Sequence, residues 1–106
     1  MGNKVNIEIP HEKIVKFCRR WKIQEFALFG SVLREDFHPE SDIDVLVSFS
    51  PDADWSLLDH IEMQQELETI LNHKVDVVSR RAVERSDNWI RRKAILESAV
   101  PYYVER

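Results

Sequence analysis

Two short stretches decide the fold, LFGSVLRED at residues 28–36 and SDIDVLV at residues 41–47. The first ends a continuous apolar run, 26–29, at a Gly-Ser pair, which is typical of a buried strand that stops at a tight turn. The second opens a Val- and Ile-rich run, 43–49, which the turn-forming residues 50–52 close, so it predicts another strand. The sequence therefore predicts two strands with a polar segment between them.

Helical patterns flank these strands on both sides. Apolar residues recur at helical spacing in 11–22, in 55–71 with Asp54 as a candidate N-cap, and in 88–98. Between the last two helices, β-branched residues dominate 74–79 and predict a third strand. The order helix, strand, strand, helix, strand, helix predicts an α/β (α+β) fold, with a small mixed β-sheet flanked by helices.

Length and composition favour one globular domain. The chain has 106 residues, 43% of them hydrophobic and 32% charged, so we expect residues 1–106 to form a single domain with its own core. No apolar run approaches the ~18 residues of a membrane helix and no signal peptide is recognisable, so we expect a cytoplasmic protein without membrane contacts. The single cysteine, Cys18, is expected to be a buried or half-buried thiol without redox chemistry.

The charge distribution bears on possible partners. A formal net charge of −4 disfavours an extended electrostatic interface with nucleic acid, so no direct nucleic acid partner is expected. The segment 80–93 is more basic, although scattered charges on a helix usually mean a solvated face. Trp89 and Ile90 fit either the core or an interface, and the tail at 99–103 is expected to be ordered or bound to a partner. A homodimer and a hetero-oligomer both remain open.

Three aspartates form the candidate catalytic group. Asp42 and Asp44 are two positions apart on a predicted strand, so their side chains leave the same face. Like charges held together cost free energy unless a cation lies between them, although this pair alone also fits the solvent face of an edge strand. Asp76 interrupts the Val-rich run 74–79, and a buried charge there must be paired, neutralised or bound to metal. The three carboxylates therefore predict a metal site.

The ligand types favour Mg²⁺ over zinc. Mg²⁺ is a hard cation that takes carboxylate oxygens and keeps waters or substrate phosphates in its shell, whereas zinc sites commonly use His and Cys. The histidines show no paired ligand spacing and are expected at the surface or at helix ends: His11, His38, His60 and His73.

A phosphate-binding turn is the second candidate feature. Gly30 and Ser31 follow a predicted strand and precede a possible short helix, where backbone N–H groups and the Ser31 hydroxyl can meet a phosphate. Alone, a Gly-Ser pair after a strand is usually only a turn. Arg34 fits a phosphate contact equally well as an ion pair with Asp36 or Glu40, so its role stays open.

The spacing joins these features into a recognisable motif. A Gly-Ser pair, ten intervening residues and Asp-x-Asp, carried by 28–36 and 41–44, strongly resemble the DNA polymerase β-like nucleotidyltransferase superfamily. Within that superfamily, the short length, Arg34 three residues after the serine, and Ser41 before the first aspartate are similar to the minimal nucleotidyltransferases, or MNT proteins. The resemblance spans about residues 14–98, and it implies the nucleotidyltransferase fold.

The resemblance also implies a role for each motif residue. Asp42 and Asp44 match the metal-binding pair, and Asp76 matches the third carboxylate, which would help orient or deprotonate the nucleophile. Gly30 and Ser31 match the turn that binds the triphosphate. Two Mg²⁺ ions, bridging the carboxylates and the triphosphate, are expected as cofactors, with ATP as the substrate.

The function implied by the resemblance is that of an antitoxin. Stand-alone minimal proteins of this kind resemble the antitoxins of HEPN/MNT pairs, which transfer AMP from ATP to a tyrosine of a HEPN ribonuclease toxin. Two alternatives remain open: a catalytically silent module that neutralises the toxin by occlusion, and a nucleotidyltransferase that acts on a small molecule such as an aminoglycoside. The intact motif weighs against the silent module.

Overall fold

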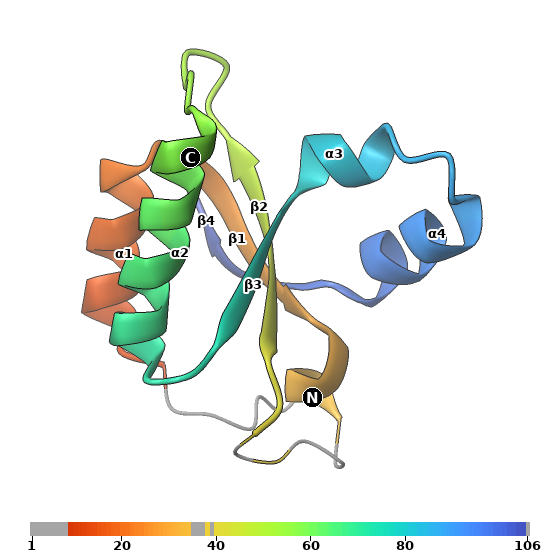
Figure 1. Ribbon diagram of the computed structural model, residues 1–106, viewed down its shortest axis with the longest axis horizontal. Helices are drawn as coiled ribbons and strands as arrows, with labels where there is room; N and C mark the ends of the chain where they lie inside the picture. The colour runs from red at the N-terminus through yellow and green to blue at the C-terminus, as the bar shows by residue number, and fades with distance from the viewer. Residues whose placement is uncertain (1–8, 35–37, 39, 106) are drawn as a thin grey trace.

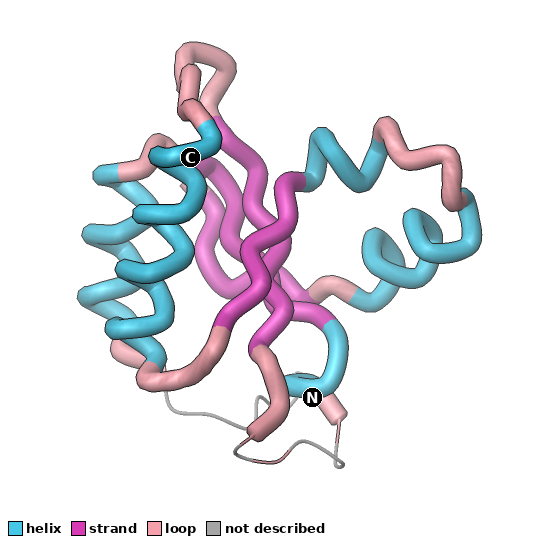
Figure 2. Tube along the Cα trace, in the orientation of Figure 1, coloured by secondary structure: helices cyan, strands magenta, loops and turns pink. Residues whose placement is uncertain are grey.

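The computed structural model of the protein describes residues 9–34, 38 and 40–105. A four-stranded sheet in the order β3-β2-β1-β4 lies at the centre, with α1 and α2 on one face and α3 and α4 on the other (Figure 1). Figure 2 shows the twisted strands between these two groups of helices. In chain order the elements are α1 (His11–Arg20), β1 (Ile23–Phe29), the 3₁₀ helix η1 (Gly30–Leu33), β2 (Ile43–Phe49), α2 (Leu57–Leu71), β3 (Val75–Ser79), α3 (Arg80–Glu84), α4 (Trp89–Ser98) and β4 (Val100–Val104).

The sheet is mixed, as the sequence predicts. β1 runs antiparallel to both β2 and β4, whereas β3 runs parallel to β2. In this register Asp44 lies between Phe29 on one side and Asp76 on the other. The end of β1 and the beginnings of β2 and β3 therefore meet at one end of the sheet.

The larger core lies between the sheet and helices α1 and α2. Phe17 of α1 and Phe26 of β1 meet edge to face, with ring centroids 6.4 Å apart. Such burial of apolar area is the main stabilising contribution in a domain of this size. The buried members are Ile14, Phe17, Cys18, Trp21, Ile23, Phe26, Leu28, Val32, Ile43, Val45, Val47, Met63, Leu67, Leu71, Val75 and Val77.

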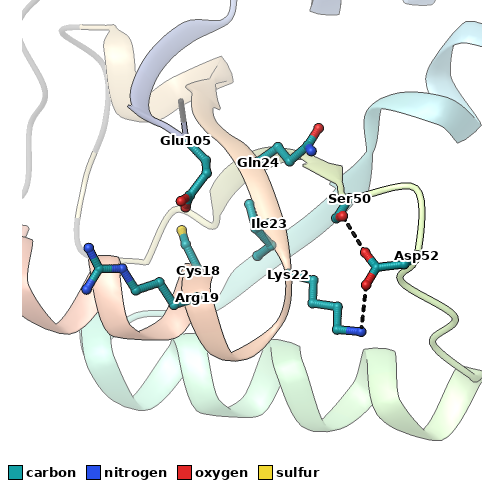
Figure 3. A pocket seen from close by; sticks show the side chains of 8 residues that line it. All are labelled: Cys18, Arg19, Lys22, Ile23, Gln24, Ser50, Asp52 and Glu105. Atoms are coloured by element: carbon teal, nitrogen blue, oxygen red, sulfur yellow. Dashed lines mark hydrogen bonds and ion pairs between the residues drawn. The ribbon is translucent and has the colours of Figure 1, made fainter.

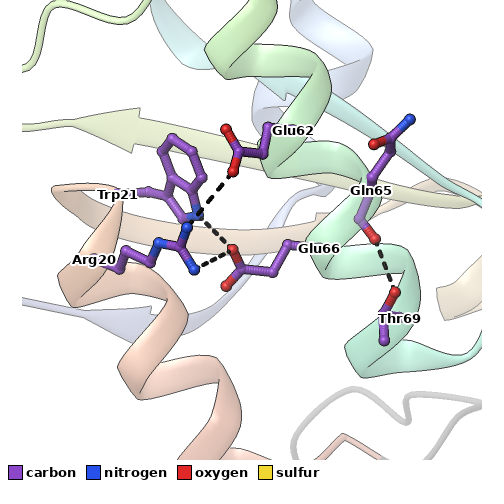
Figure 4. Close-up of polar contacts among 6 residues, drawn as sticks. All are labelled: Arg20, Trp21, Glu62, Gln65, Glu66 and Thr69. Atoms are coloured by element: carbon purple, nitrogen blue, oxygen red, sulfur yellow. Dashed lines mark hydrogen bonds and ion pairs between the residues drawn. The ribbon is translucent and has the colours of Figure 1, made fainter.

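Polar contacts hold α1 against α2 (Figure 4). The Arg20 guanidinium lies 2.9 Å from Glu66 and 3.7 Å from Glu62, and the Trp21 indole N–H donates to Glu66 over 3.2 Å. Exposed ion pairs contribute at most about 1 kcal/mol each, so these contacts orient the helices more than they stabilise the fold.

Side chains of α2 cover the outer edge of β3. Glu68 accepts a hydrogen bond from the Val75 N–H over 3.1 Å, and Gln64 accepts one from the Val77 N–H over 3.3 Å. His60 Nε2 lies 3.3 Å from the Val77 carbonyl oxygen. Because these three residues are spaced four apart, they line one face of α2 and satisfy edge groups that another strand would otherwise pair with.

Helix α2 begins later than the sequence suggests. Ser56 rather than Asp54 is the N-cap, and Ser56 forms a reciprocal capping box with Asp59. The helix is capped at its C-terminal end by Asn72, which adopts a left-handed conformation with a φ of 54°. No helix in the described part of the chain is long and apolar enough to cross a membrane.

Two elements were not expected from the sequence. The segment after β3 forms the short helix α3, for which the Ser79 side chain accepts a hydrogen bond from the Ala82 N–H. The tail becomes β4, which pairs with β1 and completes the sheet. The prediction of an ordered tail is therefore confirmed, and its order comes from strand pairing within this chain.

A smaller core lies on the opposite face of the sheet. Ala27 and Phe29 of β1 and Leu46 of β2 pack there with Val83 of α3 and Ile95 of α4. Each of these side chains is at most 8% exposed. This cluster anchors α3 and α4 against the face of the sheet opposite α1 and α2.

Candidate active site

Asp44 and Asp76 lie side by side at the beginnings of two neighbouring strands. They are register partners in the parallel pair formed by β2 and β3. Neighbouring strands are only ~4.8 Å apart, so the two carboxylates leave adjacent points of the sheet. The sequence places these residues 32 positions apart, and the fold brings them together.

The carboxylates share the face of the sheet that α3 and α4 flank. Side chains alternate along a strand, so Asp44 shares a face with Leu46, and Asp76 shares a face with Val78. Leu46 is buried in the smaller core, and Val78 packs against it. The site therefore lies at one end of the smaller core, on the opposite face from α1 and α2.

Burial differs among the three aspartates. Asp44 is half-buried, whereas Asp42 and Asp76 are exposed. The inference that Asp76 is a buried charge is thus wrong, because its side chain is exposed to solvent. Its closeness to Asp44, rather than its own burial, is what connects it to the site.

Asp44 is electrostatically perturbed. Burial raises the pKa of Asp44 above its usual value of 3.8, and the charges of Asp76 and then Asp42 raise it further. The positive charges of Arg34 and Arg91 act in the opposite direction and lower this pKa. Two arginines and two other carboxylates therefore act on Asp44, and a cation bound between the carboxylates would relieve their repulsion.

The main chain of Gly30 lies so close to Asp44 that a residue with a Cβ atom would clash there. A Cβ atom on Gly30 would lie 2.3 Å from Asp44 Oδ2, and the backbone has a φ of +78°. Only glycine adopts this conformation at little cost. The main chain at the start of η1 is thereby held against the carboxylate.

Ser31 and Arg34 stand at the two ends of this turn. The Ser31 hydroxyl donates to the Asp42 carbonyl oxygen over 3.4 Å, and the Arg34 N–H donates to the Ser31 carbonyl oxygen over 2.9 Å. Asp36, one of the ion-pair partners considered for Arg34, lies outside the described residues. The charge of Arg34 acts on Asp44, so this arginine belongs to the electrostatic environment of the site.

The site has oxygen ligands suited to a hard cation. Within the described residues, no three His, Cys, Asp or Glu side chains form a group that could hold a metal ion. Mg²⁺ commonly needs only one or two carboxylates, because waters and substrate phosphates complete its shell. The like charges of Asp44 and Asp76 fit that requirement, and the three-aspartate metal set stays a prediction.

Pockets lie at both ends of the sheet. One of about 390 Å³ includes Asp42 and is lined by Glu40, Ser41, Asp42 and Lys74. Another, of about 290 Å³, lies at the opposite end of the sheet, where β1 begins and β2 ends (Figure 3). There Lys22 and Ser50 donate hydrogen bonds to Asp52, and neither Asp44 nor Asp76 lines either of these pockets.

The model of the nucleotidyltransferase domain family matches residues 11–102. This chain belongs to that family. Protein adenylyltransferase MntA of Thermococcus cleftensis is 34% identical over 79 residues, which are 74% of this chain and 76% of the relative. A Methanocaldococcus jannaschii protein, provisionally named a protein adenylyltransferase, is 37% identical over 73 residues, 69% of this chain and 71% of its own.

Solved structures match this nucleotidyltransferase as well. A toxin-antitoxin crystal structure with AMP-PNP contains a chain that is 25% identical with a TM-score of 0.68, covering 91% of this chain and 75% of that one. A protein provisionally identified as a minimal nucleotidyltransferase is 33% identical with a TM-score of 0.66, covering 86% and 87%. A structure of a tri-AMPylated Shewanella oneidensis HEPN toxin in complex with MNT antitoxin contains a chain that matches at 25% identity and a TM-score of 0.59. The match covers 88% of this chain and 69% of that one. The expected fold is confirmed.

Sequence reasoning did not connect Arg91 with Asp44. Arg91 was expected only as part of a basic helix, yet its charge acts on Asp44. The available signal was its spacing of four from Ile95, which places both on one side of α4. The expectation for Trp89 and Ile90 was open, and both are exposed, at 60% and 64%.

Proposed function

We propose that this nucleotidyltransferase is the antitoxin of a HEPN/MNT toxin–antitoxin pair and transfers AMP from ATP to a tyrosine of the HEPN toxin. The observation that carries the proposal is the pairing of Asp44 with Asp76 beside the Gly30 turn. The relatives support the acceptor class, because one is named a protein adenylyltransferase and one match is to a complex that contains a tri-AMPylated HEPN toxin.

The proposed reaction is an in-line transfer at the α-phosphorus. The tyrosine oxygen forms a bond to this phosphorus, the bond to the bridging oxygen breaks, and pyrophosphate leaves. Asp76 is exposed, so it is available to orient the phenol and accept its proton. Asp42 and Asp44 lie nearer the turn and hold the nucleotide side of the site.

The binding of two Mg²⁺ ions is part of the proposal. When bound, the metal supplies positive charge that stabilises the attacking and departing oxygens. Asp42, Asp44 and Asp76 would hold it, and the turn at Gly30 and Ser31 would bind the triphosphate through backbone N–H groups. The repulsion that raises the pKa of Asp44 supports this assignment, since bound cations reverse such an effect.

Growth of cells that express the HEPN toxin tests the proposal. The wild-type chain should restore growth, whereas a variant with Asp42→Ala and Asp44→Ala should fail while still binding the toxin. Full rescue by the double variant would favour neutralisation by occlusion. Resistance to an aminoglycoside, without any toxin rescue, would instead favour a small-molecule acceptor. The cytoplasmic location expected from the sequence remains a prediction.

A further inference from the structure

An exposed apolar cluster lies at the start of helix α2. Leu57 and Leu58 are 77% and 78% exposed, and Ile61 is 46% exposed. Because Ile61 follows them by four and three residues, the three side chains adjoin on the outer surface of the helix. We call these three residues the α2 patch. The helix packs in the core through other positions, which are Met63, Leu67 and Leu71.

A second exposed apolar cluster lies at the start of helix α4. Trp89 and Ile90 are both largely exposed, whereas α4 packs in the smaller core through Ile95. We call Trp89 and Ile90 the α4 patch. Exposed apolar residues that stand alone are ordinary, but adjacent ones mark contact surfaces, and Trp is a frequent anchor of protein interfaces.

The two patches lie in segments of opposite charge. Residues 51–73, which contain the α2 patch, include six acidic residues and no lysine or arginine. Residues 80–93, which contain the α4 patch, include six basic residues and two acidic ones. Glu62 is exposed beside the α2 patch, and Lys93 is exposed beside the α4 patch, each one helical turn from a patch residue. Each patch is therefore an apolar centre with a charged rim, and the two rims differ in sign.

The fold keeps the two patches of one molecule apart. Helices α2 and α4 cover opposite faces of the sheet (Figure 1), so these patches cannot cover each other within one chain. A contact between two α2 patches, or between two α4 patches, would bring rims of like charge together and would cost free energy. Charge complementarity therefore favours a contact between the α2 patch of one molecule and the α4 patch of another.

We propose that a second copy of this chain docks its α4 patch on the α2 patch, with Trp89 and Ile90 packed among the apolar side chains of α2. Such a contact is heterologous, because each molecule presents a different surface to its neighbour. Two joined molecules still leave one patch of each kind open, so further copies add head to tail until a ring closes or a filament grows. This inference concerns the chain by itself and goes beyond the proposed adenylyl transfer.

Sedimentation velocity of the full chain at increasing concentration tests the contact. The sedimentation coefficient of the wild-type protein should rise with concentration, and the rise should shrink at high salt, because salt screens the attraction between the rims. Leu58→Gln and Trp89→Gln each replace one patch centre and should each weaken self-association about tenfold or more. Both positions are exposed and Gln is a good helix former, so both variants should keep the wild-type midpoint of thermal unfolding.

An equimolar mixture of the two variants gives the sharpest result. Leu58→Gln retains the α4 patch and Trp89→Gln retains the α2 patch, so the mixture should form a complex of two chains and nothing larger. Ile61→Gln and Ile90→Gln repeat the test at a second position in each patch. Lys13→Gln is the control, because Lys13 is exposed on α1 outside both patches, and it should associate as the wild-type protein does.

Three results would overturn the inference and leave the proposed function intact. The first is a wild-type chain that stays monomeric at every concentration. The second is a mixture of folded variants that does not associate. The third is either single variant associating as strongly as wild type, which indicates a contact between like patches. A monomeric wild-type chain that loses toxin binding through Leu58→Gln would overturn it in favour of the toxin as the occupant of the α2 patch.

Discussion

Gly30 and Asp44 are in contact across the end of the sheet, so closely that a Cβ on Gly30 would lie 2.3 Å from Asp44 Oδ2. The positive φ of Gly30, +78°, adds a second reason for glycine at this position. The close contact with Asp44 and the positive φ therefore both require glycine in this turn.

Gly30→Ala should therefore disturb both stability and catalysis. The added methyl group must push Asp44 away, and the alanine must adopt a left-handed backbone conformation, which costs about 1–3 kcal/mol. We expect a lower midpoint of thermal unfolding and a loss of AMP transfer even at temperatures where the variant is folded. Ser31→Ala is the comparison, because it changes the same turn without a clash and should keep the wild-type unfolding midpoint. Unchanged transfer by Gly30→Ala would show that the contact with Asp44 is not needed.

Asp44→Asn should stabilise the protein in the absence of metal. The folded-state pKa of Asp44 is raised above its usual 3.8, so ionisation of this group costs free energy in the fold. That cost is absent below about pH 3.8 and grows as the pH rises through the folded pKa. The variant should be more stable than wild type at pH 7, by up to about 1 kcal/mol after solvent screening, and the gap should shrink toward pH 4.

Urea unfolding at several pH values measures this gap. Mg²⁺ provides an independent comparison, since a ligand that binds only the folded state raises the unfolding midpoint by mass action. Mg²⁺ should raise the midpoint of wild type more than that of Asp44→Asn. A variant that is less stable than wild type at pH 7 without metal would disprove the cost of ionising Asp44 that its burial and its neighbouring carboxylates impose.

Gln64→Ala should weaken the cover of the β3 edge. It leaves the buried Val77 N–H without its 3.3 Å hydrogen bond, which costs about 1–2 kcal/mol. Gln65→Ala is a matched control, because the neighbouring Gln65 side chain is exposed on the outside of α2 (Figure 4). Urea unfolding should separate the two variants, and equal stability would mean that water replaces Gln64 without loss.

Cys18 should be unreactive in the folded protein. Burial first, and then the charge of Glu105, raise the pKa of this thiol from 9.0 to about 12, and Figure 3 shows the Glu105 carboxylate near its sulfur. Since the thiolate is the reactive form, alkylation by iodoacetamide at pH 8 should be slow until urea unfolds the chain. Mass spectrometry of the alkylated product measures the rate, and labelling of the native protein as fast as a free cysteine would contradict the burial.

The central part of the fold could be predicted because its residues carry strong local patterns. The run 26–29 and the strand β2 are apolar and end at turn-forming residues, and the motif spacing connects Gly30 with Asp44. The structure places Asp76 beside Asp44, but the argument from a buried charge was wrong, since Asp76 is exposed. Its metal-binding role remains a prediction.

Other features depend on contacts that no local pattern reveals. β4 contains Pro101, which usually argues against a strand, and it forms here because it lies at the edge of the sheet. The α2 N-cap shifted from Asp54 to Ser56 because the capping box with Asp59 satisfies two backbone groups. The charge of Arg91 acts on Asp44, 47 positions away in the sequence, so this effect depends on the tertiary structure.

The most direct test of the account is the intact mass of a co-expressed HEPN partner after incubation with this protein, ATP and Mg²⁺. The Asp42→Ala, Asp44→Ala double variant is run alongside. The account predicts that the partner gains one or more adenylyl groups with the wild-type protein and none with the variant. A partner whose mass is unchanged, although its toxicity is suppressed by both proteins, would contradict it.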